Sequence, residues 1–427
     1  MENQNDFDER SGQQKKPPEE YFFGENEAEE PDNGGKRIHN AVKMLLIVLV
    51  SALGGAAIMG LVLFKEFGGE LQTAEKYSVF LEAAQTVEER FVGEYDHQEL
   101  SDNAVAGLVA GLEDRWSHYV TAEDVQEYQN DLNNSYVGIG VSVTKEEGEG
   151  MLVASVEETG GAFAAGISAG DIITTVNGTG VLDMTLSDAK KLVVGEAGTT
   201  VTLTILKTDG TTVNVDVERR QIEEHPVIYE LIGSVGYIHL DNFNTGVADS
   251  FKAAVNDLVA QGAQSLVFDV RFNGGGLLNE MTSILDFLLP EGRIFYSVDN
   301  TGDEYQVDSD ESCIEMPMAV LVNDSSYSAA EFFAACLQEY DWATVVGQHT
   351  TGKGYSQSTI YLSDGSALVL STRKYYTPDD TNLAEAGGLA PDIAIDISDE
   401  EYQEVYLGTL AHENDTQLQA ALEAVTK

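Results

Sequence analysis

Residues 318–337 read MAVLVNDSSYSAAEFFAACL and join a strand pattern to a helix pattern through a turn that contains serines. The first six residues form a short apolar run typical of a buried strand, and the residues from Ser328 onward have the composition of a helix. Serine at such a junction is first of all a helix cap, because its hydroxyl accepts hydrogen bonds from the unpaired N–H groups of the first helical turn. The neighbouring segments decide whether a serine nucleophile is a better interpretation.

The segments around this junction alternate between strand and helix patterns. Predicted strands lie at 234–240, 265–271, 318–323 and 343–347, and predicted helices lie at 247–262 and 277–289. This alternation is typical of βαβ units, which build a largely parallel sheet. Ligands of such sheets gather at the carboxyl ends of the strands. The turn that holds Ser328 and the glycine run Asn273–Gly276 both fall at such ends.

The remaining sequence divides into segments of different texture. Residues 66–135 place apolar side chains at helical spacing and predict a helical N-terminal region. Residues 136–222 alternate β-branched residues with frequent glycine and predict a compact, mostly β module. The α/β region then runs over 223–400, and residues 401–427 form a C-terminal helical segment.

The first 65 residues predict a tail and a membrane anchor. Residues 1–40 are rich in acidic, amide and proline side chains, and we expect them to be disordered. Residues 44–64 carry no charge and would span roughly 30 Å as a helix, which favours a transmembrane anchor over 41–65 rather than a buried helix or a cleaved signal peptide. Lys36, Arg37 and Lys43 precede this run. They predict a single-pass protein of the cell membrane with a cytoplasmic N-terminus and an extracytoplasmic remainder.

Composition excludes several classes of function. The chain has 23 basic and 73 acidic residues, a formal charge of −50, which repels nucleic acid. Cys313 and Cys336 provide no metal cluster, and we interpret them as free thiols, with one bridge between them left open. We therefore expect no metal and no cofactor.

A nucleophilic serine needs a base, and two residues are candidates. His239, Asp269 and Ser328 occur in the order of a His-Asp-Ser triad, but His239 lies inside a predicted strand and no Gly-x-Ser-x-Gly elbow is present. Lys353 lies between two glycines after the strand at 343–347, so its loop can reach the serine. Because an ordinary lysine pKa is near 10.4, a lysine base must be buried so that its pKa falls to about 7 or 8.

Taken together, these motifs resemble the C-terminal processing peptidases, also called tail-specific proteases. The residues that carry the resemblance are Asn323, Ser326, Ser328 and Glu331, then Gly352 to Gln357, and Asp269, Arg271, Asn273, Gly275 and Gly276. The resemblance implies an α/β protease core of the ClpP/crotonase-like type over 223–400. It implies that Ser328 is the nucleophile, Lys353 the base and Gln357 the residue that orients the base. The N–H groups of Gly275 and Ala329 would form the oxyanion hole.

The β module carries a second resemblance. GGAFAAGISAGDIITTVNG, residues 160–178, resembles the middle of a PDZ domain. The resemblance implies that Gly138, Ile139 and Gly140 bind the terminal carboxylate of a peptide, which would lie as an added strand beside the helix near 186–192. Protein or peptide substrates would then be captured through their C-termini.

The sequence departs from the family pattern at a few places. Tyr327 replaces a small residue beside the nucleophile, Gly274 replaces proline, and Val194 stands where an arginine is common. None of these changes removes a catalytic atom. The sequence therefore predicts a membrane-anchored serine endopeptidase that cuts extracytoplasmic proteins. The alternative is a catalytically weak or inactive PDZ-containing scaffold that binds peptides, and self-association into a homo-oligomer is left open.

Overall fold

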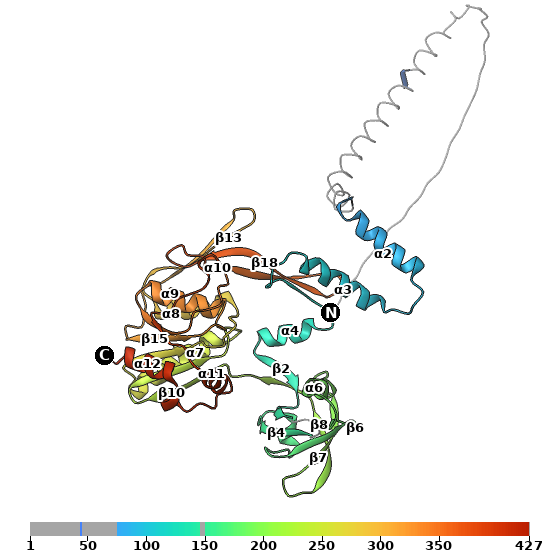
Figure 1. The fold of residues 1–427 in the computed structure, drawn as a ribbon, viewed down its shortest axis with the longest axis horizontal. Coiled ribbons are helices and arrows are strands. Elements are labelled where there is room, and N and C mark those ends of the chain that lie inside the picture. Colours follow the sequence, from blue (N-terminus) through green and yellow to red (C-terminus); the bar gives the residue numbers. More distant parts are fainter. Residues whose placement is uncertain (1–42, 45–74, 146–149, 427) are drawn as a thin grey trace, which may run out of the picture. The chain divides into compact units, whose positions relative to one another are not determined.

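The computed structural model describes residues 43–44, 75–145 and 150–426 (Figure 1). The chain divides into two compact units, 1–94 and 95–427. In the first unit, the described part is dominated by helix α2, Ser78–Arg90, which has no buried residue. The predicted tail at 1–40 and nearly all of the predicted anchor at 41–65 lie outside the described residues. Across the described ranges, no helix combines the length and apolar character needed to span a bilayer.

The second unit contains the expected parallel sheet. Its strands run in the order β10-β11-β12-β15-β16-β19. The bounds are β10 Val227–Ile232, β11 Val235–Leu240, β12 Ser265–Asp269, β15 Met318–Val322, β16 Ala343–Gly347 and β19 Ile393–Ala394. All neighbours pair in parallel except β10, which is antiparallel to β11. The parallel strands therefore end on one edge, as the βαβ pattern predicts.

Helices cover both faces of this sheet. One face packs against α7 Val247–Gln261, α8 Leu278–Leu288 and α9 Ala329–Glu339 in a core that includes Phe251, Phe268 and Phe333. The other face packs against α12, Thr416–Ala424, through Leu418 and Ala421. The apolar runs of the central strands are explained by this arrangement, because a strand covered on both faces needs no polar side.

A second, antiparallel sheet was not predicted. Its strands run in the order β1-β18-β13-β14, with β17 also paired to β18. The bounds are β1 His118–Val120, β13 Gly292–Asp299, β14 Glu304–Ser309, β17 Tyr355–Tyr361 and β18 Ala367–Tyr376. The pairing of His118 with Val369 brings the segment before β1 next to the hairpin that follows Lys353. The N-terminal region is therefore not purely helical, although it also contains α3 His97–Ala110 and α4 Val125–Leu132.

The mostly β module has its own sheet, β3-β4-β5-β7-β8 with β6 on β5. The bounds are β3 Val141–Thr144, β4 Met151–Val156, β5 Ile172–Val176, β6 Thr179–Gly180, β7 Thr200–Leu206 and β8 Thr212–Glu218, with helices α5 Gly161–Ala164 and α6 Leu186–Val193. A separate apolar core fills it, formed by residues such as Ile173, Leu203 and Val217. Strands β2, Ser135–Gly138, and β9, Arg220–Glu223, pair with each other and hold its two ends together.

The C-terminal segment and the cysteines complete the fold. Short helices α10 Leu383–Ala386, α11 Asp399–Tyr406 and a 3-10 turn at His412–Asn414 precede α12. The C-terminal helical segment thus begins two residues before the predicted position 401. Cys313 and Cys336 are both free thiols, and Cys336 is buried within α9.

Candidate active site

Ser328 stands at the start of α9 in a backbone conformation that is unusual for a residue with a side chain. Its φ is 60° and its ψ is −125°, and its hydroxyl makes no capping hydrogen bond to the first turn of the helix. A positive φ outside glycine costs free energy and is concentrated at functional sites. The helix-cap interpretation of this serine is therefore wrong. The Ser328 hydroxyl makes no hydrogen bond with any residue of the described ranges, so it is available to a substrate.

The other two serines of the turn have structural partners. The Ser326 hydroxyl is fully buried, donates to the carbonyl of Val270 at 2.8 Å and accepts from the Asn323 N–H at 3.0 Å. The Ser325 hydroxyl lies 3.0 Å from the phenol oxygen of Tyr402. These bonds fix the turn that presents Ser328.

Lys353 follows β16 and is buried, with 7% of its surface exposed. Within the described ranges its ammonium group makes no hydrogen bond or ion pair, and aromatic rings lie nearby instead. The nitrogen lies 4.6 Å from the Trp116 ring centre and 6.0 Å from that of Tyr327. The pKa of Lys353 is lowered to about 8, mainly by burial and also by the charge of Arg115, while the carboxylates of Asp114 and Glu331 oppose that change.

Glu331 fixes the backbone of the lysine loop to the serine helix. Its fully buried carboxylate accepts from the N–H groups of Gly352 at 2.7 Å and Lys353 at 2.9 Å, and from the Thr350 hydroxyl. Burial raises the pKa of Glu331, and these hydrogen bonds oppose the increase. The Tyr375 hydroxyl donates to the Lys353 carbonyl. The lysine loop is thereby held beside the first turn of α9.

Gly275 lies against the same helix start. A Cβ atom at this position would lie 2.7 Å from the Ser328 Cβ and 2.8 Å from the Ala329 nitrogen, and its φ of +93° also requires glycine. The structure thus brings the two predicted oxyanion donors together. It differs from the expectation in one respect, because the Gly275 N–H already donates to the Asn273 side-chain oxygen at 2.8 Å. The Ala329 N–H has no hydrogen-bond partner in the described ranges.

Gln357 lies on β17, and within the described ranges its amide makes no hydrogen bond to the lysine side chain. Its amide nitrogen donates to the carbonyl of Tyr355 at 3.0 Å and to the hydroxyl of Ser371 at 3.0 Å. The Ser371 N–H donates to Ser117, whose hydroxyl donates to Asp114 at 2.6 Å. Gln357 is therefore connected through hydrogen bonds to the segment that carries Trp116, and it is not hydrogen-bonded to Lys353.

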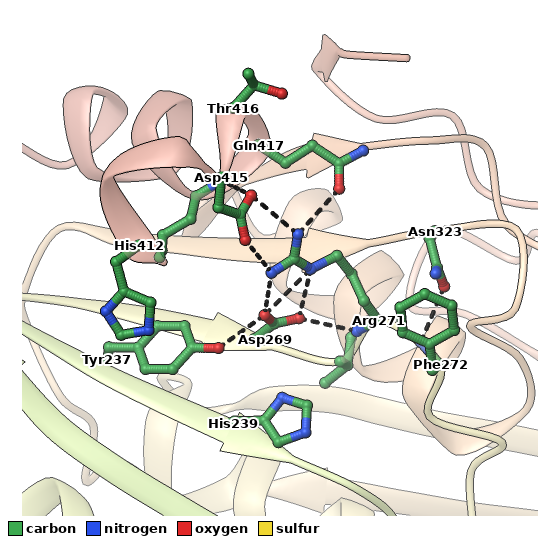
Figure 2. Close-up of polar contacts among 12 residues, drawn as sticks. Tyr237, His239, Asp269, Arg271, Phe272, Asn323, His412, Asp415, Thr416 and Gln417 are labelled. Atoms are coloured by element: carbon green, nitrogen blue, oxygen red, sulfur yellow. Dashed lines mark hydrogen bonds and ion pairs between the residues drawn. The ribbon is translucent and has the colours of Figure 1, made fainter. Parts of the chain in front are cut away.

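The residues of the rejected triad lie in a different network. Asp269 and Arg271 form a buried ion pair at 2.6 Å, and Tyr237 donates to the same carboxylate at 2.9 Å (Figure 2). Burial would raise the pKa of Asp269, but the guanidinium of Arg271 outweighs it and holds that pKa below its usual range. His239 bonds to Asp241 at 2.9 Å. Asp269 is therefore part of a buried ion-pair network, and in the described ranges neither Asp269 nor His239 is hydrogen-bonded to Ser328.

Sequence reasoning missed the aromatic surroundings of the lysine. Trp116 precedes β1, in a stretch whose spacing indicated only a helical region, and nothing local marks it as part of a site. Tyr327 was noticed as a departure from the family pattern, but its contact with the lysine depends on the turn before α9. The position of Trp116 depends on the pairing of β1 with β18.

The predicted peptide-binding loop lines a cavity of about 760 Å³. Gly138, Ile139 and Gly140 lie on its wall, together with Lys190 and Val193 of α6. The carbonyls of Ile139 and Gly140 accept from the N–H groups of Ala162 and Glu157, at 2.8 and 2.9 Å, and these bonds fix the loop.

In the described parts of the chain, no group of three or more His, Cys, Asp or Glu side chains is arranged to hold a metal ion.

Comparisons with known proteins agree with this architecture. Residues 234–395 match the model of peptidase family S41, and residues 137–218 match that of the PDZ domain. A CtpA-like serine protease of Staphylococcus epidermidis is 31% identical over 315 residues, which cover 73% of this chain and 64% of that protein. A protein of the same name from Staphylococcus aureus is 28% identical over 377 residues, 86% of this chain and 75% of that protein.

A solved structure shows the same fold. It is described as an S41 protease from Bacteroides fragilis and is 19% identical. The match covers 78% of this chain and 92% of that one, with a TM-score of 0.52. At this identity the likeness supports the fold and leaves the chemistry to the residues described above.

Proposed function

We propose that the chain is a PDZ-containing member of peptidase family S41 and a serine endopeptidase of the C-terminal processing type, with Ser328 as nucleophile and Lys353 as general base. The observation that carries the proposal is the buried lysine. Its amine has a pKa of about 8, and its backbone N–H donates to Glu331 on the helix that begins after Ser328. Such a lysine supplies a neutral amine beside a serine whose hydroxyl makes no hydrogen bond in the described ranges.

The pKa of Lys353 decides whether it can act as a base. At pH 7.5 an amine with a pKa of about 8 is neutral roughly a quarter of the time. An amine with the ordinary value of 10.5 would be neutral about once in a thousand. Burial therefore increases the share of competent base by more than two orders of magnitude.

The reaction follows the acyl-transfer scheme. The Ser328 oxygen attacks the peptide carbonyl carbon while the neutral amine of Lys353 takes the hydroxyl proton. The Ala329 N–H binds the oxyanion, and the Gly275 N–H joins it once the Asn273 oxygen releases that group. The Lys353 ammonium then gives its proton to the leaving amine. Water, deprotonated by the same amine, hydrolyses the acyl-enzyme. Gln357 orients the base in this scheme if its amide turns away from Ser371.

The PDZ domain is proposed to receive protein or peptide substrates through their C-termini, with the carboxylate bound at Gly138, Ile139 and Gly140. We also propose that the apolar segment within 41–65 anchors the protein in the cell membrane, with the PDZ and protease regions outside the cytoplasm. The support for this anchor is the sequence pattern. The chain spans 64% of the length of the Staphylococcus epidermidis relative. The activity of the whole protein is therefore part of what we propose.

A second candidate function is a weak or inactive peptide-binding scaffold. It is favoured by two contacts at the site, the Gly275 N–H engaged by Asn273 and the Gln357 amide engaged by Ser371. If neither contact can be broken, the site lacks one oxyanion donor and the predicted orienting residue. Substrate cleavage distinguishes the two functions.

The test is cleavage of an unfolded protein by the ectodomain, with wild type beside Ser328→Ala and Lys353→Ala. Both variants should lose cleavage and keep the circular dichroism of wild type, because nucleophile and base act as one unit. Matched controls are Ser358→Ala on the exposed side of β17 and Lys252→Ala on α7, which should cleave normally. Retained cleavage in Ser328→Ala, or none in wild type, would reject the proposed chemistry.

A further inference from the structure

Lys353 is unusual among buried cations because its surroundings are aromatic. More than nine-tenths of the residue is buried, and the ring of Trp116 lies 4.6 Å from its nitrogen. Trp116 and Tyr327 are themselves in contact, with ring centres 5.2 Å apart and a 35° angle between planes. The two rings come from the segment before β1 and from the turn before α9, so the fold assembles this pocket from distant parts of the chain.

Charged and titratable groups face the pocket from each neighbouring element. Asp114 and Arg115 lie beside Trp116, and the Arg115 guanidinium carbon is 4.0 Å from its ring centre. Glu331 approaches from α9 and binds the lysine backbone. From β18, the phenol of Tyr375 donates to the Lys353 carbonyl. The hydrogen bonds of Asp114 go to Ser117 and to the Trp116 N–H. Neither carboxylate neutralises the ammonium by direct contact.

We propose that Trp116 and Tyr327 are positioning residues: their two rings, in contact with each other, form an aromatic clamp beside the Lys353 amine and keep water away from it. The inference rests on the proposed function, since the clamp serves catalysis only if Lys353 is the base. In this proposal neither ring exchanges a proton or forms a bond in the reaction. Their contribution is to fix the side chain of the base and to control its protonation.

Two effects of the rings on Lys353 oppose each other. An aromatic face attracts an ammonium ion, which favours the charged form. Exclusion of water disfavours that form, and burial is the largest cause of the lowered pKa. In this proposal exclusion of water is the larger effect, in line with burial as the main cause of a pKa lowered to about 8. Removing a ring should therefore admit water and raise the pKa.

Gly274 makes room for this clamp. A Cβ atom at Gly274 would lie 2.6 Å from the Tyr327 hydroxyl and 2.9 Å from the ring carbon that bears it. The two departures from the family pattern, glycine for proline and tyrosine for a small residue, therefore meet in space. Tyr327 can occupy its position beside the lysine because Gly274 has no side chain.

The experiment compares Trp116→Ala, Trp116→Phe, Tyr327→Ser and Tyr327→Phe with wild type. The first measurement is the titration of the Lys353 amine by NMR of ¹³C-labelled lysine in a Ser328→Ala background, assigned with Lys353→Arg. The second is kcat and KM against pH. Trp342→Phe is the control, because Trp342 packs against the main core. We expect the titration midpoint of the Lys353 amine to rise by about one pH unit in Trp116→Ala and Tyr327→Ser. It should stay near the wild-type value in both phenylalanine variants.

The same change should appear in the kinetics. In the two small-residue variants kcat/KM near pH 7 should fall about tenfold and recover at alkaline pH, since only the neutral fraction of the base has changed. An unchanged titration midpoint in both small-residue variants, or an equal loss of activity at every pH, would reject the role of the two rings. If Trp116→Ala does not fold, Tyr327→Ser makes the same test from the other ring.

The two readouts separate this inference from the function on which it rests. If the titration midpoint of the Lys353 amine shifts in the variants but wild type cleaves no substrate, the rings control the protonation of Lys353 and the proposed peptidase activity is rejected. If cleavage depends on Ser328 and Lys353 but the titration midpoint is unshifted in Trp116→Ala and Tyr327→Ser, the peptidase activity is supported and the role of the two rings is rejected.

Discussion

Burying the Lys353 amine costs free energy of folding, and this cost depends on pH. The amine has a pKa of 10.5 in the unfolded chain and about 8 in the folded protein, so the unfolded state binds more protons between these values. Stability should therefore rise with pH across this window, by about 3 kcal/mol from this residue. Below pH 8 both states are protonated and the full penalty applies.

The measurement is urea unfolding at several pH values from 7 to 10.5 for wild type and Lys353→Met. The difference between the two curves isolates the lysine, because all other groups titrate in both proteins. Lys353→Met should be the more stable protein at pH 7, and the advantage should disappear at the alkaline end. Lys252→Met, in which the replaced lysine is only partly buried, should follow wild type. Parallel curves for wild type and Lys353→Met would show that the amine is not perturbed.

Gly274 and Tyr327 should behave as an energetically coupled pair. Gly274→Ala places a methyl group 2.6 Å from the Tyr327 hydroxyl, so we expect a loss of roughly 1–3 kcal/mol in the free energy of unfolding. Tyr327→Ser should remove most of that loss when the two changes are combined. A double-mutant cycle in urea measures the coupling. Gly180→Ala, where the new methyl group meets open space and the φ is ordinary, is the control. Additive effects would mean that the tyrosine moves aside without cost.

Ser328 and Lys353, the proposed nucleophile and base, could be placed at one edge of the sheet from sequence because each follows an apolar strand of one parallel sheet. Ser328 follows β15 and Lys353 follows β16, so their loops share an edge. Trp116 could not be predicted, because its position depends on the pairing of β1 with β18 more than two hundred residues later. The engagement of the Gly275 N–H by Asn273 depends on side-chain rotation within one turn, which a motif does not encode.

At the scale of elements, the difference between the two sheets follows from burial. β12 and β15 are buried along their whole length and therefore read as continuous apolar runs. β14 and β17 are mostly exposed, so polar residues interrupt the period-two pattern that indicates a strand. The central sheet was predicted for this reason, and the antiparallel sheet beside it was not.

Helix α12 is anchored by ions rather than by apolar contact alone. Arg271 donates to both Asp415 oxygens, at 3.1 and 2.8 Å, and to Gln417 at 3.1 Å (Figure 2). Asp415 also caps α12 by accepting from the Leu418 N–H at 2.9 Å. Arg271 precedes Asn273 by two residues, so this network connects the C-terminal helix to the turn that holds Gly275.

Asp415→Ala should therefore cost stability by two routes. It leaves the Arg271 guanidinium, which is 3% exposed, with one carboxylate fewer, and it removes the helix cap. Together we expect a loss of about 3–5 kcal/mol, measured by urea unfolding. Asp415→Asn retains the cap and should lose less. Glu413→Ala, in the preceding turn, is the control. Hydrogen exchange should show faster opening of α12 in Asp415→Ala, and unchanged protection there would contradict the anchoring role.

At the scale of the whole molecule, the PDZ domain is inserted with both ends tied together. Tyr136 pairs with Ile222 and Val137 with Gln221, so the insertion leaves and re-enters the protease region at one place. A module attached in this way can be removed without separating the flanking strands. Binding in its groove can alter catalysis only if two states of the enzyme bind the peptide unequally.

We predict that a free substrate C-terminus accelerates cleavage through this domain. The loop at Gly138, Ile139 and Gly140 lines the cavity, and glycines let a carboxylate approach backbone N–H groups closely. The test is cleavage of one unfolded substrate with a free or an amidated C-terminus. It is repeated in a variant in which residues 137–221 are replaced by Asn-Gly, because two residues close a hairpin between Tyr136 and Ile222. Wild type should prefer the free C-terminus by a lower KM, and the deletion variant should treat both substrates alike. Equal rates for the two substrates in wild type would reject carboxylate capture, whereas a preference that survives the deletion would place the carboxylate site in the protease region.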